Sequence, residues 1–377
     1  MEQLDKLLKY GQSYWLDNLS REMIVNGELE KRIKNEGLRG ITSNPKIFHK
    51  AITNGNLYDD QLKELVDQGK NPESVYEALA IHDIQKACDM LRPVYDESDG
   101  MDGFVSLEVS PYLAKDTEKT KSETRRLFKT VNRPNCMIKI PGTKEGIPAI
   151  ESMLYESVNI NVTLLFSIEA YEAVANAYMH ALEHRFDDGQ PIDRIASVAS
   201  FFLSRIDVLA DKTLLNDIIP ALEGDKKIMA RNILGETAIS SAKIAYQSFE
   251  KIFGDDRWKK LANKGARVQR PLWASTSNKT EGYRDTRYVE PLIGQHTVNT
   301  MPEETIEAFK HHGKLFPNTI KENVDRSLKV FNHLKIIGIN IKDLTDQLEE
   351  EGIDKFVKPF DELLKAIEEH IKEPHYH

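Results

Sequence analysis

The chain has few cysteines, no long hydrophobic segment and no excess of positive charge. Its 377 residues include only two cysteines, Cys88 and Cys136, whose separation matches no metal-binding motif. Two thiols in a chain of this size suit a reducing compartment without structural disulfides. No uncharged apolar run approaches the roughly 18 residues of a transmembrane helix, and the first residues do not resemble a signal peptide. These absences predict a cytoplasmic protein that does not enter a membrane.

The charge balance argues against nucleic acid and anionic membranes as partners. The chain has 60 acidic and 51 basic residues, a formal net charge of −9. Such a balance disfavours nonspecific attraction to nucleic acid or to anionic lipid. A local basic pocket could still hold a small phosphate, so phosphorylated metabolites remain candidate substrates.

Short apolar segments alternate with longer segments of helical periodicity, a pattern typical of parallel βα units. The eight expected strands cover residues 14–16, 38–41, 104–107, 137–140, 160–165, 195–199, 271–274 and 297–300. Eight such units close a (β/α)₈ barrel. No repeat or Gly/Ser-rich linker indicates a second domain. We therefore expect an α/β fold in which residues 1–377 form one TIM barrel domain with extra helices.

The longest helical patterns cover residues 71–95, 168–185 and 229–253. A helical extension is expected from about residue 303 to residue 377. It carries a C-terminal helix with one apolar stripe, formed by Phe360, Leu363, Leu364 and Ile367.

Lys139 is the most informative single residue. It lies in an apolar strand that ends at Pro141 and Gly142. Because side chains alternate between the two faces of a strand, Lys139 points into the barrel if Ile138 and Ile140 pack outward. Burial lowers the pKa of an ammonium group, and the neutral amine can attack a carbonyl. The alternative is a strand-end lysine whose ammonium reaches solvent.

Other polar residues lie at or near the expected C-terminal ends of the strands, where the chemistry of a (β/α)₈ barrel takes place. They are Asp17, Asn44, Glu108, Asn161, Thr163 and Ser200. Each has an ordinary alternative: Asp17 or Asn44 could cap a helix, and Thr163 is a good strand former. Together around one inward lysine they favour a ligand site, because buried polar groups cost stability unless they are satisfied.

Several segments carry a family resemblance. GITSNPKIF at residues 40–48, MIKIPGT at 137–143 and NINVTLLFS at 159–167 together resemble transaldolase, and WASTSNK at 273–279 with VNTMP at 298–302 resembles the longer transaldolases of some bacteria. The resemblance covers about residues 13–302. It implies a (β/α)₈ class I aldolase without metal or organic cofactor. The implied reaction, in the non-oxidative pentose phosphate pathway, converts sedoheptulose 7-phosphate and glyceraldehyde 3-phosphate into erythrose 4-phosphate and fructose 6-phosphate by transfer of a dihydroxyacetone unit.

The resemblance also implies catalytic roles for four residues. Lys139 would be the Schiff-base nucleophile on the ketose carbonyl. Glu108 would be an acid/base that works through a water, which Thr163 helps to hold. Asp17 would take and return the proton of the hydroxyl at which the C–C bond breaks.

Substrate-binding roles follow in the same way. Asn44, Asn161 and Ser200 would hydrogen-bond the dihydroxyacetone moiety. Arg205 would bind the substrate phosphate, since a guanidinium suits phosphate oxygens.

The sequence departs from the shorter transaldolases after the seventh strand. Those enzymes place a second phosphate arginine where this chain has Ser277. Ser275 and Lys279 are the expected substitutes, although a Ser/Thr/Asn-rich segment is also what an ordinary loop contains.

Alternative functions differ in how the site is used. A lysine-dependent aldolase would release free dihydroxyacetone without an acceptor. Phe202 is a candidate control point for that balance, because a hydroxyl there would change how water is held. A noncatalytic sugar-phosphate-binding barrel would form no imine.

No metal site is expected. His180 and His184 lie one helical turn apart, but the sequence lacks the His-Glu-x-x-His pattern there and offers no third ligand. The expected partners are sugar phosphates alone, bound by a monomer or homodimer.

Overall fold

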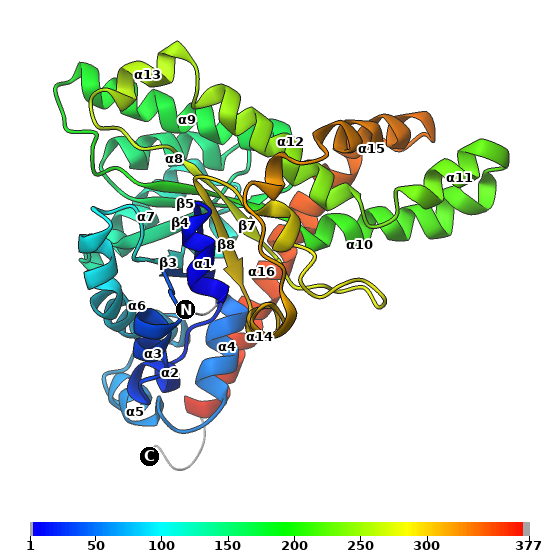
Figure 1. Cartoon of the computed structure of the whole chain (residues 1–377). Helices are drawn as coiled ribbons and strands as arrows, with labels where there is room; N and C mark the ends of the chain where they lie inside the picture. The colour runs from blue at the N-terminus through cyan, green and yellow to red at the C-terminus, as the bar shows by residue number, and fades with distance from the viewer. Residues whose placement is uncertain (1–2, 372–377) are drawn as a thin grey trace.

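The computed structural model describes residues 3–371; residues 1–2 and 372–377, the two ends of the expected domain, lie outside the described residues. Eight parallel strands close a barrel in the order β1 to β8 (Figure 1), which confirms the expected (β/α)₈ architecture. The strands are β1 (Gln12–Leu16), β2 (Gly40–Ile41), β3 (Phe104–Glu108), β4 (Cys136–Pro141), β5 (Ile160–Leu165), β6 (Ser197–Phe202), β7 (Arg270–Ala274) and β8 (Thr297–Met301).

All strands except β5 differ from expectation at one or both ends, and two of them, β2 and β6, begin later than predicted. β2 has two residues rather than four, and β6 begins two residues later than predicted and runs on through Phe202. At the start of β6 the amide of Ala196 donates to the side-chain Oδ1 of Asn159 at 3.2 Å instead of joining the ladder. Ser200, which was expected to continue the sixth strand, lies inside β6.

The fifth strand also departs from simple alternation. Leu164 has a φ of 61°, and the register between β5 and β6 shifts between Val162 and Leu165. Strict alternation would place Leu164 on the same face as Val162, but this left-handed residue instead lines a small cavity beside Lys139. The irregularity lies at the end of the barrel where the site is expected.

Sixteen α-helices accompany the strands. They are α1 (Gln3–Lys9), α2 (Arg21–Val25), α3 (Glu28–Asn35), α4 (Pro45–Thr53), α5 (Asp59–Asp67), α6 (Pro72–Glu97), α7 (Thr117–Val131), α8 (Gly146–Tyr155), α9 (Ile168–Asp187), α10 (Ser204–Thr213), α11 (Gly224–Asn232), α12 (Thr237–Ile252), α13 (Asp256–Ala262), α14 (Glu303–His312), α15 (Val324–Ile336) and α16 (Ile341–Ile371), within the described residues 3–371. None of these described helices is long and apolar enough to cross a membrane.

The predicted helices 71–95 and 168–185 are confirmed as α6 and α9. The prediction of one helix over 229–253 is wrong, because the segment divides into α11 and α12. Gly235 between them has a φ of 69°, a conformation that favours glycine, and its amide donates to Asp211 Oδ1 at 2.8 Å.

A buried polar network fills the N-terminal end of the barrel. Arg270 Nη1 lies 3.1 Å from Asp102 Oδ1, while Ser13 Oγ and Trp15 Nε1 donate to the same carboxylate at 2.5 and 3.0 Å. Both charges are paired and hydrogen-bonded, as buried charges require. A ligand must therefore enter at the opposite end, where the strands terminate.

The C-terminal helix α16 lies across that opposite end. It packs against α4, α6, α10 and β5, and Figure 1 shows it in orange to red beside α4 and α10. Gly352 permits the close approach, since a Cβ there would lie 3.1 Å from Leu164 Cδ2. The expected apolar stripe is present: Phe360, Leu363 and Ile367 are buried, with Leu364 partly buried.

Candidate active site

An open cavity occupies the C-terminal mouth of the barrel. Strands β4, β5, β6, β7 and β8 reach it, together with α4, α10, α16 and the loops after β1, β2 and β7. The predicted site residues that line it are Asp17, Asn44, Lys139, Thr163, Ser200, Phe202, Arg205 and Ser275. The structure thus brings together residues that are spread over more than two thirds of the sequence.

Lys139 and Glu108 form the charged centre of this site. They are register partners on β4 and β3, and the Lys139 ammonium makes an ion pair with Glu108. Lys139 Nζ also donates to the carbonyl oxygen of Ser43 at 3.0 Å, and the residue is only 5% exposed. Burial raises the pKa of Glu108, although the charge of Lys139 opposes that shift. A carboxyl group beside the ammonium of a lysine can act as a general acid or base.

Asp17 comes directly after β1 and lines the same cavity as Lys139. Thr42 Oγ1 donates to Asp17 Oδ1 at 2.7 Å, and the same hydroxyl lies 2.7 Å from Thr300 Oγ1. Burial raises the pKa of Asp17, again opposed by the charge of Lys139. Thr42 and Thr300 were not among the predicted site residues, although each lies within one of the family motifs. Their hydroxyls hold the Asp17 carboxylate in one orientation.

Asn161 and Ser200 form a hydrogen-bonded chain below the cavity. Ser200 Oγ donates to Asn161 Oδ1 at 2.7 Å, and Asn161 Nδ2 donates to Ser106 Oγ at 3.0 Å. Asn161 is fully buried and does not line the cavity, so its described contacts connect it to the cavity through Ser200. Thr163 Oγ1 is buried without a hydrogen-bond partner among the described residues, which leaves it free to bind a ligand.

Asn44 caps a helix and also lines the cavity, so the structure agrees with both roles that the sequence suggests for it. Its Oδ1 accepts from the amide of Ile47 at 3.0 Å and caps α4, with Pro45 at the first helical position. The same residue lines the cavity. The cap fixes the orientation of the side chain and leaves its amide nitrogen for a ligand.

Arg205 lies at the start of α10 between two aromatic rings. Its guanidinium carbon lies 5.3 Å from the Phe202 ring centroid and 5.9 Å from that of Phe356. Nη1 is buried without a hydrogen-bond partner among the described residues. Burial lowers the pKa of Arg205, but an arginine side chain stays charged in proteins. The site therefore holds a positive group with an unused donor, as an anion site requires.

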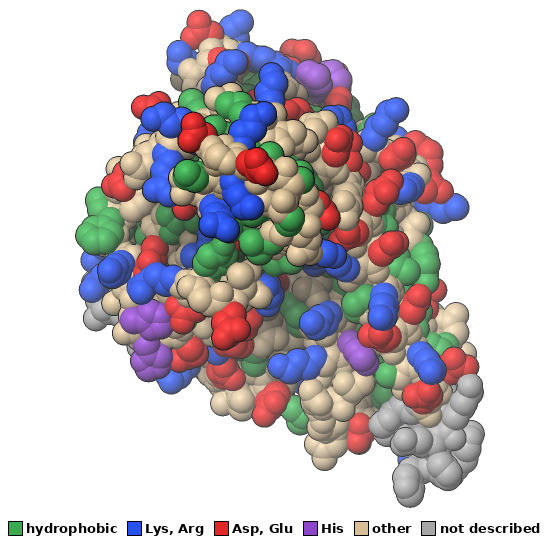
Figure 2. Space-filling view, turned by 90° about the vertical axis from the view of Figure 1, so that its right-hand side faces the viewer, with side chains coloured by type: hydrophobic (Ala, Val, Ile, Leu, Met, Phe, Trp, Pro, Cys, Tyr) green, Lys and Arg blue, Asp and Glu red, His purple; other side chains and the backbone are tan. Residues whose placement is uncertain are grey.

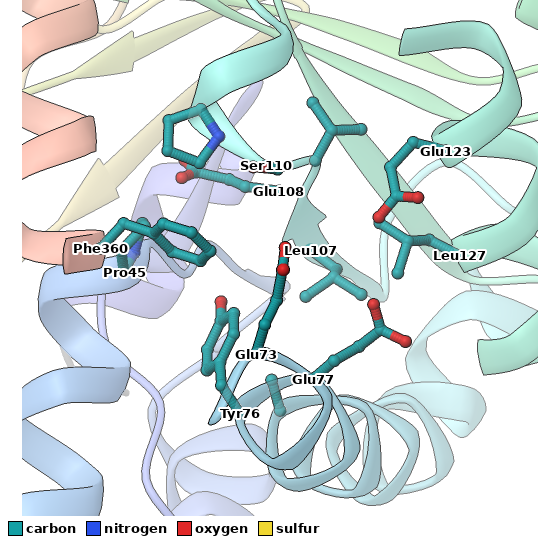
Figure 3. Close-up of a pocket in the computed structure, with 13 residues that line it drawn as sticks. Pro45, Glu73, Tyr76, Glu77, Leu107, Glu108, Ser110, Glu123, Leu127 and Phe360 are labelled. Carbon is teal, nitrogen blue, oxygen red and sulfur yellow. The ribbon is translucent and has the colours of Figure 1, made fainter. Parts of the chain in front are cut away.

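A second, smaller cavity lies beside the first (Figure 3). Glu108 lines it, together with Tyr76 and three further acidic residues, Glu73, Glu77 and Glu123. No lysine or arginine lines this cavity among the described residues. Negative charges repel phosphate, so of these two cavities the one at the barrel mouth is the better fit for a phosphate group.

Comparison with known proteins agrees with this geometry. The model of the family described as Transaldolase/Fructose-6-phosphate aldolase matches residues 14–367. The chain belongs to this family. It is 48% identical over 364 residues to the transaldolase of Trichodesmium erythraeum, with 96% of each chain covered. It is 46% identical to transaldolase 2 of Nostoc punctiforme and 43% identical to the transaldolase of Thermobifida fusca, with 97% of each chain covered in both cases.

The family match extends beyond the motifs quoted from the sequence. Those motifs end near residue 302, whereas the match runs to residue 367 and includes α14, α15 and most of α16. The C-terminal helix is therefore part of what this chain shares with the transaldolase family. Its Lys355, Phe356 and Pro359 line the cavity, and sequence reasoning missed all three. Lys46, at the start of α4, was missed as well.

Of the two residues expected to replace the second phosphate arginine, only one lines the cavity among the described residues. Ser275 lines the cavity, and its Oγ lies 2.7 Å from Ser204 Oγ. Lys279 is exposed, does not line the cavity, and directs its Nζ to within 3.8 Å of Glu304 Oε1. Ser277, the position of that arginine in the shorter transaldolases, is buried. The structure does not bring Lys279 to the predicted site.

Proposed function

We propose that this protein acts as a transaldolase and that Lys139 forms a Schiff base with the ketose donor. The observation that carries the proposal is the buried Lys139 ammonium, which pairs with Glu108 at the mouth of the barrel. The same ammonium is close enough to Asp17 for its charge to oppose the rise in the pKa of Asp17 that burial causes. Relatives named transaldolase, 43–48% identical over nearly the whole chain, support the same activity.

The proposed reaction begins when the neutral amine of Lys139 attacks the ketose carbonyl carbon. The resulting carbinolamine loses water to give the protonated imine, with Glu108 as the acid/base and Thr163 Oγ1 as a ligand of the departing water. Asp17 then takes the proton of the hydroxyl adjacent to the breaking bond. The C–C electron pair moves into the imine, the aldose phosphate leaves, and an enamine remains on Lys139.

The second half of the reaction reverses these steps with a new aldehyde. The enamine attacks the carbonyl carbon of the acceptor, and Asp17 returns its proton to the new hydroxyl. Water then hydrolyses the imine and releases the longer ketose. Every bond broken in the donor is remade in the product, so no oxidant, reductant or metal is required.

Substrate positioning falls to the polar residues around this centre. We assign the hydroxyl groups of the dihydroxyacetone moiety to Asn44 and Ser200, with Asn161 acting through Ser200. Arg205 binds the substrate phosphate. The substrates proposed are sedoheptulose 7-phosphate and glyceraldehyde 3-phosphate, exchanged for erythrose 4-phosphate and fructose 6-phosphate in the pentose phosphate pathway.

We further propose that residues 1–377 form one domain, because α16 packs back onto the barrel that β1 begins. Cys88 and Cys136 are buried free thiols, which supports a reducing, cytoplasmic setting. Whether the chain is a monomer or a homodimer stays a prediction.

The competing proposal is an aldolase that releases dihydroxyacetone to water. Phe202 puts an apolar ring beside Ser200 in the cavity wall, and Phe166 packs against it at 5.4 Å. The Phe202 side chain itself offers no hydroxyl that would hold a hydrolytic water. It favours transfer over release.

The test is covalent trapping. Fructose 6-phosphate is added, the protein is reduced with borohydride, and adducts are mapped by peptide mass. We expect a three-carbon adduct on Lys139, none in Lys139→Ala, and an unchanged adduct in Lys144→Ala, which alters an exposed lysine just after β4. An unmodified wild-type protein, or an adduct on another lysine, contradicts the assignment. Loss of the trapped adduct on adding glyceraldehyde 3-phosphate distinguishes transfer from simple cleavage.

A further inference from the structure

The strands around the proposed site, and the segments that directly follow them, place too few positive charges near Arg205 to balance the two negative charges of a phosphate group. Arg205 is the cation that β6 and its following helix place in the cavity, with one unused buried donor. The loop after β7 contributes Ser275, while Lys279 faces Glu304 instead. A phosphate monoester carries close to two negative charges at neutral pH. A second positive charge must therefore come from elsewhere in the cavity wall.

The face of the molecule that Figure 2 shows carries no broad positive area, among the described residues, that could supply it. On the side of the molecule at the right of Figure 1, lysine and arginine side chains intermix with acidic ones (Figure 2). Attraction of a phosphate must therefore depend on individual residues that line the cavity.

Two such residues are Lys46 and Lys355. Lys46 lies in the first turn of α4, directly after the Asn44 cap, and makes no ion pair among the described residues 3–371. Lys355 lies on α16, and its Nζ pairs with Glu351 Oε2 at 2.7 Å. The Lys355 side chain is 50% exposed. An exposed pair on one helix contributes little energy, so a phosphate can replace the glutamate as partner.

The turn of α16 that carries Lys355 is held at the mouth of the barrel. The neighbouring Phe356 ring centroid lies 5.9 Å from Lys139 Nζ and 5.9 Å from the Arg205 guanidinium carbon. Gly352 one turn earlier sits close against Leu164 and Phe166. Glu351, the partner of Lys355, is close enough for its charge to act on Arg205. Lys355 and Arg205 therefore belong to one electrostatic environment.

We propose that Lys355 of α16 and Lys46 of α4 bind the phosphate of the sugar substrate together with Arg205, so that the C-terminal helix supplies the charge that the loop after β7 lacks. This inference rests on the proposed function, because it takes a sugar phosphate as substrate. The ammonium groups act as point charges at the rim, whereas Arg205 supplies the directional contact. They contribute to binding of the phosphate and leave the chemistry at Lys139 unchanged.

The experiment compares Lys355→Gln, Lys46→Gln and the double variant with Lys358→Gln, which removes an exposed lysine of α16 that does not line the cavity. We expect each single variant to raise KM for fructose 6-phosphate by about fivefold and the double variant by about twentyfold, with kcat nearly unchanged. The inhibition constant of inorganic phosphate should rise in parallel. Lys355→Arg should restore most of the lost affinity, and Lys358→Gln should match the wild type.

Unphosphorylated dihydroxyacetone separates this inference from the proposed function. Its borohydride adduct on Lys139 should form equally in the wild type and in all of these variants. If the wild type forms the adduct but the double variant keeps wild-type KM and phosphate inhibition, the inference on Lys46 and Lys355 is overturned. It is also overturned if trapping of dihydroxyacetone falls as much as fructose 6-phosphate binding does. Absence of any adduct in the wild type instead overturns the proposed function.

Discussion

Lys139 and Glu108 are joined as a buried ion pair across the adjacent strands β4 and β3. The pairing has a direct chemical meaning. A lysine attacks a carbonyl only as the free amine, and a neighbouring carboxylate can accept the proton that it must lose. Burial raises the pKa of Glu108, so the proton it receives can be passed on at the dehydration step.

Glu108→Gln tests this role. The amide keeps the size of the side chain but can neither take nor return a proton, so imine formation should slow. We expect kcat to fall by about 10²- to 10³-fold, with borohydride trapping on Lys139 slowed to a similar degree. Glu123→Gln, in the wall of the adjoining acidic cavity, is the matched control and should retain wild-type activity. Trapping at the wild-type rate in Glu108→Gln would show that the carboxylate is not the acid/base of this step.

Asp17→Asn should separate imine formation from C–C cleavage. The asparagine can still accept the hydrogen bond from Thr42 but cannot take a proton, so turnover should fall by about 10²- to 10⁴-fold. Trapping of dihydroxyacetone on Lys139 should persist, because that adduct needs no C–C cleavage. Equal loss of trapping and turnover contradicts the assignment.

The pH profile of the wild type gives an independent check on Asp17. Burial raises its pKa, and the proposed base is the ionised form. The acid limb of the pH profile of transfer activity should therefore lie above the ordinary aspartate pKa of about 4. An acid limb at or below that value, with the protein still folded, would contradict the proposed role.

Phe356 should determine how well the enamine on Lys139 is protected from water. Its ring lies 5.9 Å from Lys139 Nζ and comes from a helix that closes the mouth of the barrel. Phe356→Ala opens that wall, so dihydroxyacetone release without an acceptor should rise relative to transfer. Phe356→Leu keeps an apolar cover and should stay close to the wild type. An unchanged release-to-transfer ratio in Phe356→Ala would show that α16 does not exclude water.

Much of this architecture was predictable from local sequence pattern. Lys139 stands out because one charge interrupts an apolar strand, and the polar ends of β1, β3 and β5 follow from alternation and strand length. The irregular Leu164 was not predictable, since its left-handed backbone depends on how β5 meets β6 rather than on its own side chain.

The contribution of α16 was not predictable for a different reason. Lys355 and Phe356 look like ordinary positions of an amphipathic helix, and only the packing of that helix across the barrel brings them to Lys139, more than 200 residues earlier in the chain. Lys279 shows the reverse error. Its position near β7 suggested the cavity, but its exposed side chain does not line the cavity, and its Nζ lies 3.8 Å from Glu304 Oε1.

Asp207 provides a test of stability rather than catalysis. It is fully buried on α10, accepts from the Ala238 amide at 2.7 Å and the Tyr288 hydroxyl at 2.8 Å, and lies 3.3 Å from Arg287 Nη2. These contacts tie the loop after β7 to α10 and α12. Burial raises the pKa of Asp207 to about 6, in spite of these partners.

A raised carboxyl pKa has a definite consequence for the pH dependence of stability. The Asp207 carboxyl group loses its proton near pH 4 in the unfolded chain and near pH 6 in the folded chain. Its contribution to the free energy of unfolding is therefore fully present below about pH 4 and is lost as pH rises through 6. Relative to Asp207→Asn, the wild type should lose about 3 kcal/mol of unfolding free energy between pH 4 and pH 7. Thermal melts of both proteins across this range measure the difference, which cancels the titration of all other groups. A Tm difference that does not change with pH, or one that favours the wild type as pH rises, would mean that Arg287 and the two hydrogen bonds outweigh burial and keep the Asp207 carboxylate ionised throughout.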